Sequence, residues 1–174
     1  LVTIIDPHIK NTEPDYFLLK QGLSRDLFVL EKSGKPYTGH CWPGSSHWLD
    51  FMNPEVTSLL EEIYTGQHHE ASEDFIWTDS WVHIWNDMNE PACFMPTDKT
   101  MPKSNLHKFG DGTKVEHRDV HCLYGHYNSK ATHSAMLKRS PDERPFILTR
   151  SFNAGTQRYA AVWCGDATCS WSHF

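Results

Sequence analysis

Four short apolar segments, each ending near a polar residue and separated from the next by a longer stretch, constrain the fold of this chain most strongly. The segments are residues 1–5, 82–85, 145–149 and 160–163, and the polar residues that follow them are Asp6, Asp87, Arg150 and Asp166. Strands that alternate with helix-length connections are typical of a parallel α/β barrel or of a doubly wound sheet. The pattern therefore predicts an α/β fold with polar side chains at the carboxyl ends of its strands.

Two of the connections carry helix signals. Asn53 and Pro54 begin the clearest helix, whose apolar residues Val56, Leu59, Leu60, Ile63 and Tyr64 share one face, with Gly66 at its end. A second helix is expected from about Glu116 to Arg139, with an inner face made by Val120, Leu123, Tyr124, Tyr127, Ala131, Ala135 and Met136. Further expectations are a short helix at 13–20 stopped by Gly22, a hairpin over 27–39, a strand segment at 75–77 and a long loop from Pro91 to about Thr113.

The length decides how much of such a fold the chain can form. A complete (β/α)8 barrel needs about 250 residues, whereas this chain has 174 and about four core strands. The long segments after the strands, rich in Trp and carboxylates, favour a barrel over an open sheet. We therefore expect a partial (β/α)8 TIM barrel, with residues 1–174 forming a central segment that is incomplete at both ends. A start without Met indicates that upstream sequence is missing.

Composition excludes several classes of function. The chain has 16 Lys and Arg against 22 Asp and Glu, a net charge of −6, which argues against nucleic-acid binding. No apolar run is long enough to cross a membrane. Five cysteines without a C-x-x-C pair indicate neither a disulfide framework nor a zinc ribbon. His117 and His121 lie one helical turn apart and invite a metal-site interpretation, but solvated or hydrogen-bonded helix residues are the better one.

Asp87 and Asp166 are the candidate catalytic pair. Each follows a tryptophan, Trp85 or Trp163, by two or three residues. Glycoside hydrolysis uses two carboxylates, and the flat face of Trp packs against the C–H face of a sugar. The opposing interpretation is that these carboxylates cap helices or pair with cations such as Arg150, and the spacing alone leaves both open.

The residues around this pair resemble glycoside hydrolase family 31, the retaining α-glucosidases and their relatives. The segment from Trp85 to Pro91 (WNDMNEP) is similar to the nucleophile signature of that family. The rest of the chain agrees in order, through the segments IDPHI at 5–9, WPGSSHW at 42–48, DFMNP at 50–54, HRDVH at 117–121, RPFILTRSF at 144–152 and VWCGD at 162–166. The similarity is strongest to the neutral α-glucosidase branch, which includes endoplasmic-reticulum glucosidase II.

The resemblance implies a role for each matching residue. Asp87 corresponds to the nucleophile and Asp166 to the acid/base of a double displacement that removes terminal α-linked glucose from oligosaccharides or N-glycans. The implied substrate-binding residues are Asp6, Trp42, Trp85, Met88, Arg150 and Trp163. The chemistry needs no cofactor and no metal. Resemblance to glucosidase II also implies a β-type partner subunit and localisation in the endoplasmic-reticulum lumen.

Three departures from the family pattern keep two other hypotheses open. Ala167 stands where the family usually has Asn beside the acid/base, Asn153 replaces an aromatic residue, and Ala160 replaces Gly. The alternatives are an inactive carbohydrate-binding homologue and a non-functional truncated product, whose open half barrel would expose strand edges.

Overall fold

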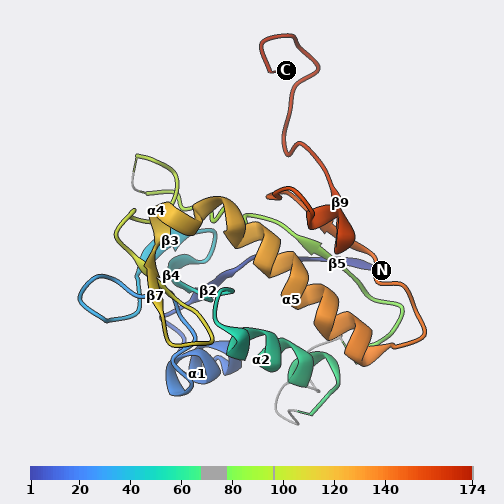
Figure 1. Cartoon of the computed structure of the whole chain (residues 1–174), viewed down its shortest axis with the longest axis horizontal. Helices are drawn as coiled ribbons and strands as arrows, with labels where there is room; N and C mark the ends of the chain where they lie inside the picture. The colour runs from blue at the N-terminus through green and yellow to red at the C-terminus, as the bar shows by residue number, and fades with distance from the viewer. Residues whose placement is uncertain (68–77, 96, 174) are drawn as a thin grey trace.

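A computed structural model describes residues 1–67, 78–95 and 97–173 of the chain. Its centre is a four-stranded parallel sheet (Figure 1), which confirms the predicted α/β arrangement. The sheet is formed, in spatial order, by β1 (Val2–Ile5), β5 (His83–Asn86), β8 (Ile147–Thr149) and β9 (Ala161–Val162). The strand segment expected at 75–77 lies outside the described residues.

Two helices cover one face of this sheet. These are α2 (Pro54–Tyr64) and α5 (Tyr124–Arg139), which pack against each other while α5 also contacts β5 and β8 (Figure 1). Asn53 caps α2 by accepting a hydrogen bond from the Glu55 amide at 3.0 Å, and all five predicted apolar residues of its inner face are buried. The opposite face of the sheet is less covered, because Val2 and Ile4 are about half exposed. The prediction of a fully buried first strand was therefore wrong for this face.

Smaller elements extend the structure beyond the carboxyl ends of the parallel strands. β2 (His8–Lys10), β4 (Gly44–Trp48) and β3 (Gly39–Cys41) form an antiparallel sheet, and β6 (Leu106–Lys108) pairs with β7 (Lys114–Glu116). The predicted long loop from Pro91 therefore contains a β-hairpin. Within the described residues, no helix is both long and apolar enough to span a bilayer.

The first helix lies further along the chain than predicted. It is α1 (Phe17–Ser24), so Gly22 is inside the helix and does not stop it. A Cβ at Gly22 would lie 2.2 Å from the Phe28 ring, so this glycine permits close packing between α1 and Phe28. Gly22, which the sequence pattern indicated as a helix stop, is thus required for the close packing of α1 against Phe28.

The hairpin predicted over 27–39 is present only as local pairing. The Tyr37 amide donates to the Val29 carbonyl at 2.8 Å, and Leu30 forms an isolated bridge with Pro36. The Glu31 amide also donates to the Lys35 carbonyl at 2.8 Å, and Leu30 exchanges two further backbone hydrogen bonds, of 3.0 and 2.7 Å, with Leu106. A long-range partner is therefore added to the local pairing of the hairpin.

The helix expected over 116–139 is divided into three parts: α4 (His117–Val120), the 3₁₀ turn η2 (His121–Leu123) and α5. The division falls at Val120, whose φ of −127° and ψ of 4° leave the helical region. The buried face of α5 also contains the polar residues Asn128, Ser129 and Thr132, which the apolar pattern did not predict. Thr132 accepts a hydrogen bond from Asn86 of β5 and Asn128 accepts one from Asn89, whereas Ser129 donates to the Gly125 carbonyl within α5.

Candidate active site

The register of the parallel sheet places four side chains in one row. Ile5 pairs with Asn86, Asn86 with Thr149, and Thr149 with Val162. The next residue of each strand is therefore also in register, and these are Asp6, Asp87, Arg150 and Trp163. Since alternate residues of a strand point to opposite faces, the row lies on the face opposite to Asn86 and Thr149, away from the helices. Three of the four residues that the sequence predicted at strand ends are thus brought together.

Arg150 is the central contact of this row. Its Nη1 lies 3.2 Å from Oδ1 of Asp87, and it forms a two-pronged pair with Glu90 through Nε to Oε1 at 2.8 Å and Nη2 to Oε2 at 3.1 Å. Nη2 also donates to the Met88 sulfur at 3.0 Å. The hydrogen bonds and charge of Glu90 raise the pKa of Arg150, so the guanidinium is permanently charged beside Asp87.

A buried polar network fixes the segment after Asp87. Asn89 is fully buried and donates through Nδ2 to Asn128 at 2.9 Å and to the Thr149 hydroxyl at 2.8 Å. Its Oδ1 accepts a hydrogen bond from the Ser151 amide at 2.9 Å. Because buried amides are costly when unpaired, this network ties the loop after β5 to the end of β8. It explains why the inner face of α5 is polar at this point.

The backbone of Met88 also aims Asp87. Met88 has φ +55°, an uncommon value for a residue with a side chain, and its amide donates to Asp87 Oδ1 at 2.9 Å. Local strain of this kind is often found where a functional side chain must be held in position. Asp87 is therefore held by a backbone amide on one side and by Arg150 on the other.

Electrostatics single out Asp6. Burial, followed by the negative charges of Asp87 and Glu90, raises the pKa of Asp6 to about 6, although Arg150 acts in the opposite direction. His8 lies 3.5 Å away, but burial lowers its pKa to about 4, so it is neutral at neutral pH. Two buried atoms of the site, Asp6 Oδ1 and Trp85 Nε1, form no hydrogen bond with any residue that the structure describes.

The predicted tryptophans lie in two places. Trp85 and Trp163 meet edge to face on the row, with ring centroids 5.5 Å apart. Trp42 lies in the turn between β3 and β4, where it is 69% exposed and meets Phe94 edge to face at 4.6 Å. Trp42 therefore presents a free aromatic surface, and the structure gives it no contact with the row.

Asp166 is exposed. Gly165, with φ +72°, brings the backbone so close to Arg150 that an added Cβ would lie 3.1 Å from its Cδ. The Asp166 charge contributes to the raised pKa of Arg150. After β9 the chain leaves the body of the molecule as an extended segment that leads to the C-terminus (Figure 1).

Sequence reasoning missed Glu90 and Asn89. Both lie within three residues of Asp87, in the segment that carries the family resemblance, and this proximity was the available signal. Their contacts with Arg150 and Thr149 join residues about 60 positions apart, and no local pattern predicts such pairs.

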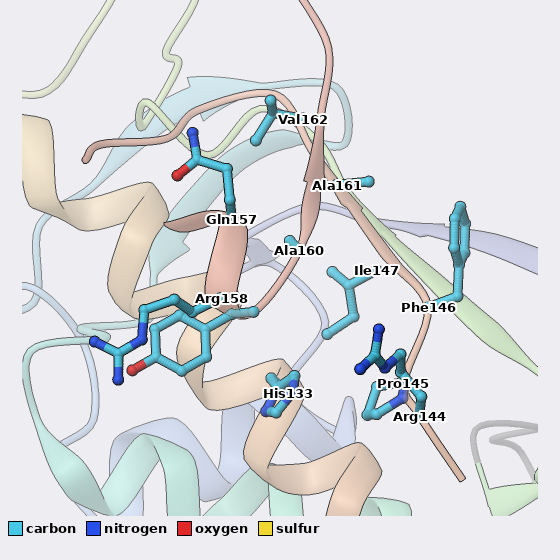
Figure 2. A pocket seen from close by; sticks show the side chains of 11 residues that line it. His133, Arg144, Pro145, Phe146, Ile147, Gln157, Arg158, Ala160, Ala161 and Val162 are labelled. Atoms are coloured by element: carbon cyan, nitrogen blue, oxygen red, sulfur yellow. The ribbon is translucent and has the colours of Figure 1, made fainter. Parts of the chain in front are cut away.

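A hollow in the described structure lies away from this row. It has a volume of about 630 Å³ and lies between α5 and the segments around β8 and β9 (Figure 2). His133, Phe146, Arg158 and Tyr159 line it, and none of its lining residues is a carboxylate. This hollow therefore lacks the acid chemistry of the row.

All five cysteines are free thiols. Among the described residues, no group of three His, Cys, Asp or Glu side chains is arranged to hold a metal ion. His117 and His121 are hydrogen-bonded to each other at 2.9 Å, in agreement with the preferred interpretation of their spacing.

Comparison with known families gives a match over the whole chain. The model described as the glycosyl hydrolases family 31 TIM-barrel domain matches residues 1–174. The predicted barrel fold class is thereby confirmed, while the boundaries within a complete barrel stay a prediction.

Individual relatives agree with this match. Neutral alpha-glucosidase C of Homo sapiens is 42% identical over 174 residues, which cover 99% of this chain and 18% of that protein. Glucosidase 2 subunit alpha of Schizosaccharomyces pombe is 42% identical over 175 residues, with the same shares. A crystal structure of an ER glucosidase II heterodimeric complex, of a catalytic subunit and the binding domain of a regulatory subunit, superimposes with a TM-score of 0.84 at 46% identity, covering 98% of this chain and 18% of that one. The chain spans under a fifth of the length of these relatives.

Proposed function

Because this chain belongs to glycoside hydrolase family 31, we propose that it carries the reacting carboxylates of a retaining α-glucosidase. The observation that supports this most is the row of Asp6, Asp87 and Arg150 at the carboxyl ends of parallel strands. Catalytic groups of α/β barrels come from this end of several different strands. The likeness to proteins named α-glucosidases supports the substrate class.

The proposed reaction is a double displacement. Asp87 attacks the anomeric carbon while Asp166 protonates the departing glycosidic oxygen, which gives a covalent glucosyl-enzyme. Asp166 then takes a proton from water, the water releases glucose from Asp87, and the configuration is retained. The contacts of Asp87 support its role as a nucleophile, since Arg150 and the Met88 amide both hold its Oδ1 in position.

Substrate binding is proposed for the remaining residues of the site. A glucose unit offers hydroxyl groups to the buried atoms Asp6 Oδ1 and Trp85 Nε1 and to the guanidinium of Arg150. Trp163 and Met88 supply apolar surface beside them. The exposed face of Trp42 would contact the sugar at the entrance.

The relatives support a proposal for the natural substrate, the partner and the compartment. The likeness to glucosidase II supports removal of terminal glucose from N-glycans, together with a β-type regulatory subunit and residence in the endoplasmic-reticulum lumen. The similar identity to neutral alpha-glucosidase C supports a shorter α-glucoside or a glucan as the alternative substrate. Comparing the rates on a glucosylated N-glycan and on maltose would decide between them.

The test replaces each carboxylate and varies the leaving group. Asp87→Asn is expected to abolish hydrolysis of both p-nitrophenyl α-glucoside and maltose, because no nucleophile remains. Asp166→Asn is expected to abolish maltose hydrolysis but to retain release of p-nitrophenol in the first turnover, since that leaving group needs little protonation. Asp142→Asn changes an exposed carboxylate and is the control. Full activity of Asp87→Asn would refute the proposal.

A carbohydrate-binding protein without turnover is the second candidate. It is favoured by the exposed position of Asp166 and by Ala167 beside it. This function predicts glucose or maltose binding by calorimetry with no released glucose. Release of glucose that depends on Asp166 would exclude it.

A further inference from the structure

A row of four buried or half-buried side chains, separate from the carboxylates above, is linked by hydrogen bonds without a break. Asp50 Oδ1 lies 2.7 Å from Nδ1 of His107, His107 Nε2 lies 2.9 Å from Nδ1 of His117, and His117 Nε2 lies 2.9 Å from Nδ1 of His121. The first three residues are at most 1% exposed, and His121 is half-buried. The row connects the loop before α2 to β6, α4 and η2, near the labels β7 and α4 in Figure 1.

The outer end of the row opens on a small pocket. Its volume is about 370 Å³, and it is lined by Asp98, Thr100, Lys103, His117, Arg118 and His121. His107 and Asp50 are not among the lining residues. A proton from solvent can therefore enter at His121, whereas the carboxylate at the inner end has no exposed surface.

The hydrogen bonds fix the tautomers of the neutral row. Asp50 also accepts from the amides of Met52 and Lys108, at 3.3 and 2.6 Å, so its carboxylate acts as an acceptor. His107 must then donate through Nδ1, which leaves its Nε2 as the acceptor for His117. The same step repeats at His121, so all three neutral rings carry their proton on Nδ1. In this state Nε2 of His121 is the one ring nitrogen of the row that is not engaged within it.

We propose that this row is a proton relay, which binds one proton from the pocket at His121 and stores its charge on His107 beside Asp50. The added proton binds His121 Nε2, and the proton on His121 Nδ1 passes to His117 Nε2. The proton on His117 Nδ1 then passes to His107 Nε2. His107 keeps its Nδ1 proton and becomes the imidazolium, while His117 and His121 end as neutral rings protonated on Nε2. The row thus takes up one proton and gains one positive charge, and all the hydrogen bonds between its members are kept.

The surroundings explain why the charge moves inward. Asp50 has no exposed surface and accepts hydrogen bonds from two backbone amides and from His107, so an imidazolium at His107 would place a positive charge directly beside its buried carboxyl group. His117, the middle ring, is an unfavourable place for the positive charge, because burial and the charges of His107 and His121 lower its pKa to about 3. Burial also lowers the pKa of His121, although the charge of Glu90 opposes this.

The other titratable groups near the row do not replace Asp50. Tyr124 of α5 lies against His107, with ring centroids 6.0 Å apart, and its pKa is raised well above the usual value by burial and by Asp50, so it stays neutral. Asp98, Lys103 and Arg118 face the pocket end with mixed charge. Glu90 acts on His121 but is paired with Arg150 at 2.8 Å.

The experiment is a pH titration of the purified protein labelled with ¹⁵N histidine, in which ring nitrogen shifts report both the tautomer and the charge. The expected result is one common midpoint for His107, His117 and His121. On the acid side, His107 should have two protonated nitrogens, and the other two rings should have changed from the Nδ1–H to the Nε2–H tautomer. Three different midpoints, uptake of more than one proton, or an imidazolium at His121 with unchanged neighbours would each overturn the relay.

Two variants sharpen the test. Asp50→Asn keeps the shape but removes the negative charge, so the row should bind its proton at least about tenfold more weakly, and the common midpoint should shift to lower pH. His133→Gln changes a histidine outside the row and should leave the midpoint in place. An unchanged midpoint in folded Asp50→Asn would refute storage beside Asp50. The titration of the parent protein decides the proposal even where this variant does not fold.

Discussion

Replacing Asp6 with Asn is expected to stabilise the fold at neutral pH. The carboxyl group is 23% exposed, lies with Asp87 and Glu90 on one side of the site, and has a pKa raised from 3.8 to about 6. At neutral pH the Asp6 carboxylate is therefore ionised, although burial and the neighbouring negative charges disfavour this form. Asn has the same shape and carries no charge, so the variant removes this cost.

The magnitude and its pH dependence follow from the two pKa values. A carboxyl group whose pKa is higher in the folded than in the unfolded state destabilises the fold once both states are ionised. The cost is absent below about pH 4, where both states are protonated, and grows as pH rises to about 6. A difference of about two pKa units corresponds to about 3 kcal/mol, and partial exposure reduces this to about 2–3 kcal/mol. His8 does not offset it there, because its own pKa is lowered to about 4.

Urea denaturation followed by the fluorescence of the seven tryptophans measures the effect. At about pH 7.5 the variant should exceed the parent in free energy of unfolding by about 2–3 kcal/mol, and the difference should nearly vanish at about pH 4. Asp142→Asn, at an exposed site, should differ from the parent by less than about 0.5 kcal/mol. Equal stability of the parent and Asp6→Asn at both pH values would refute the argument. Under the proposed function, hydrolysis of an α-glucoside by the variant should fall, because binding sites trade stability for function.

Two further substitutions test the contacts of the site. Glu90→Gln removes the charged, two-pronged pair with Arg150. It should lower kcat/KM for p-nitrophenyl α-glucoside about tenfold, a modest effect because Glu90 is partly exposed. An unchanged kcat/KM would show that this pair does not position Arg150. Gly125→Ala should lower the free energy of unfolding by about 1–3 kcal/mol, because the new Cβ would lie 2.6 Å from the Ser151 side chain. Its matched control is Lys130→Ala, exposed on the same helix; equal urea midpoints for the two variants would contradict the close approach of α5 to Ser151.

Local pattern accounted well for the elements that carry the site. The apolar segments became the parallel strands, and α2 begins at Pro54 with all five predicted residues buried, because strand and helix periodicity are short-range properties. Local pattern failed where a distant partner intervened. Leu106 pairs with Leu30 in addition to the expected hairpin, and Phe28 made Gly22 a packing position inside a helix.

The sequence by itself determined which residues lie at the carboxyl ends of the strands, since Asp6 and Arg150 directly follow an apolar segment and Asp87 lies two residues after one. Only the tertiary structure decided how they interact. Three features depend on distances between residues far apart in the chain. They are the ion pair of Glu90 with Arg150, the raised pKa of Asp6 and the hydrogen-bonded series from Asp50 to His121. Those distances arise when the strands and helices pack, and charge interactions and hydrogen bonds act through that space and not along the sequence.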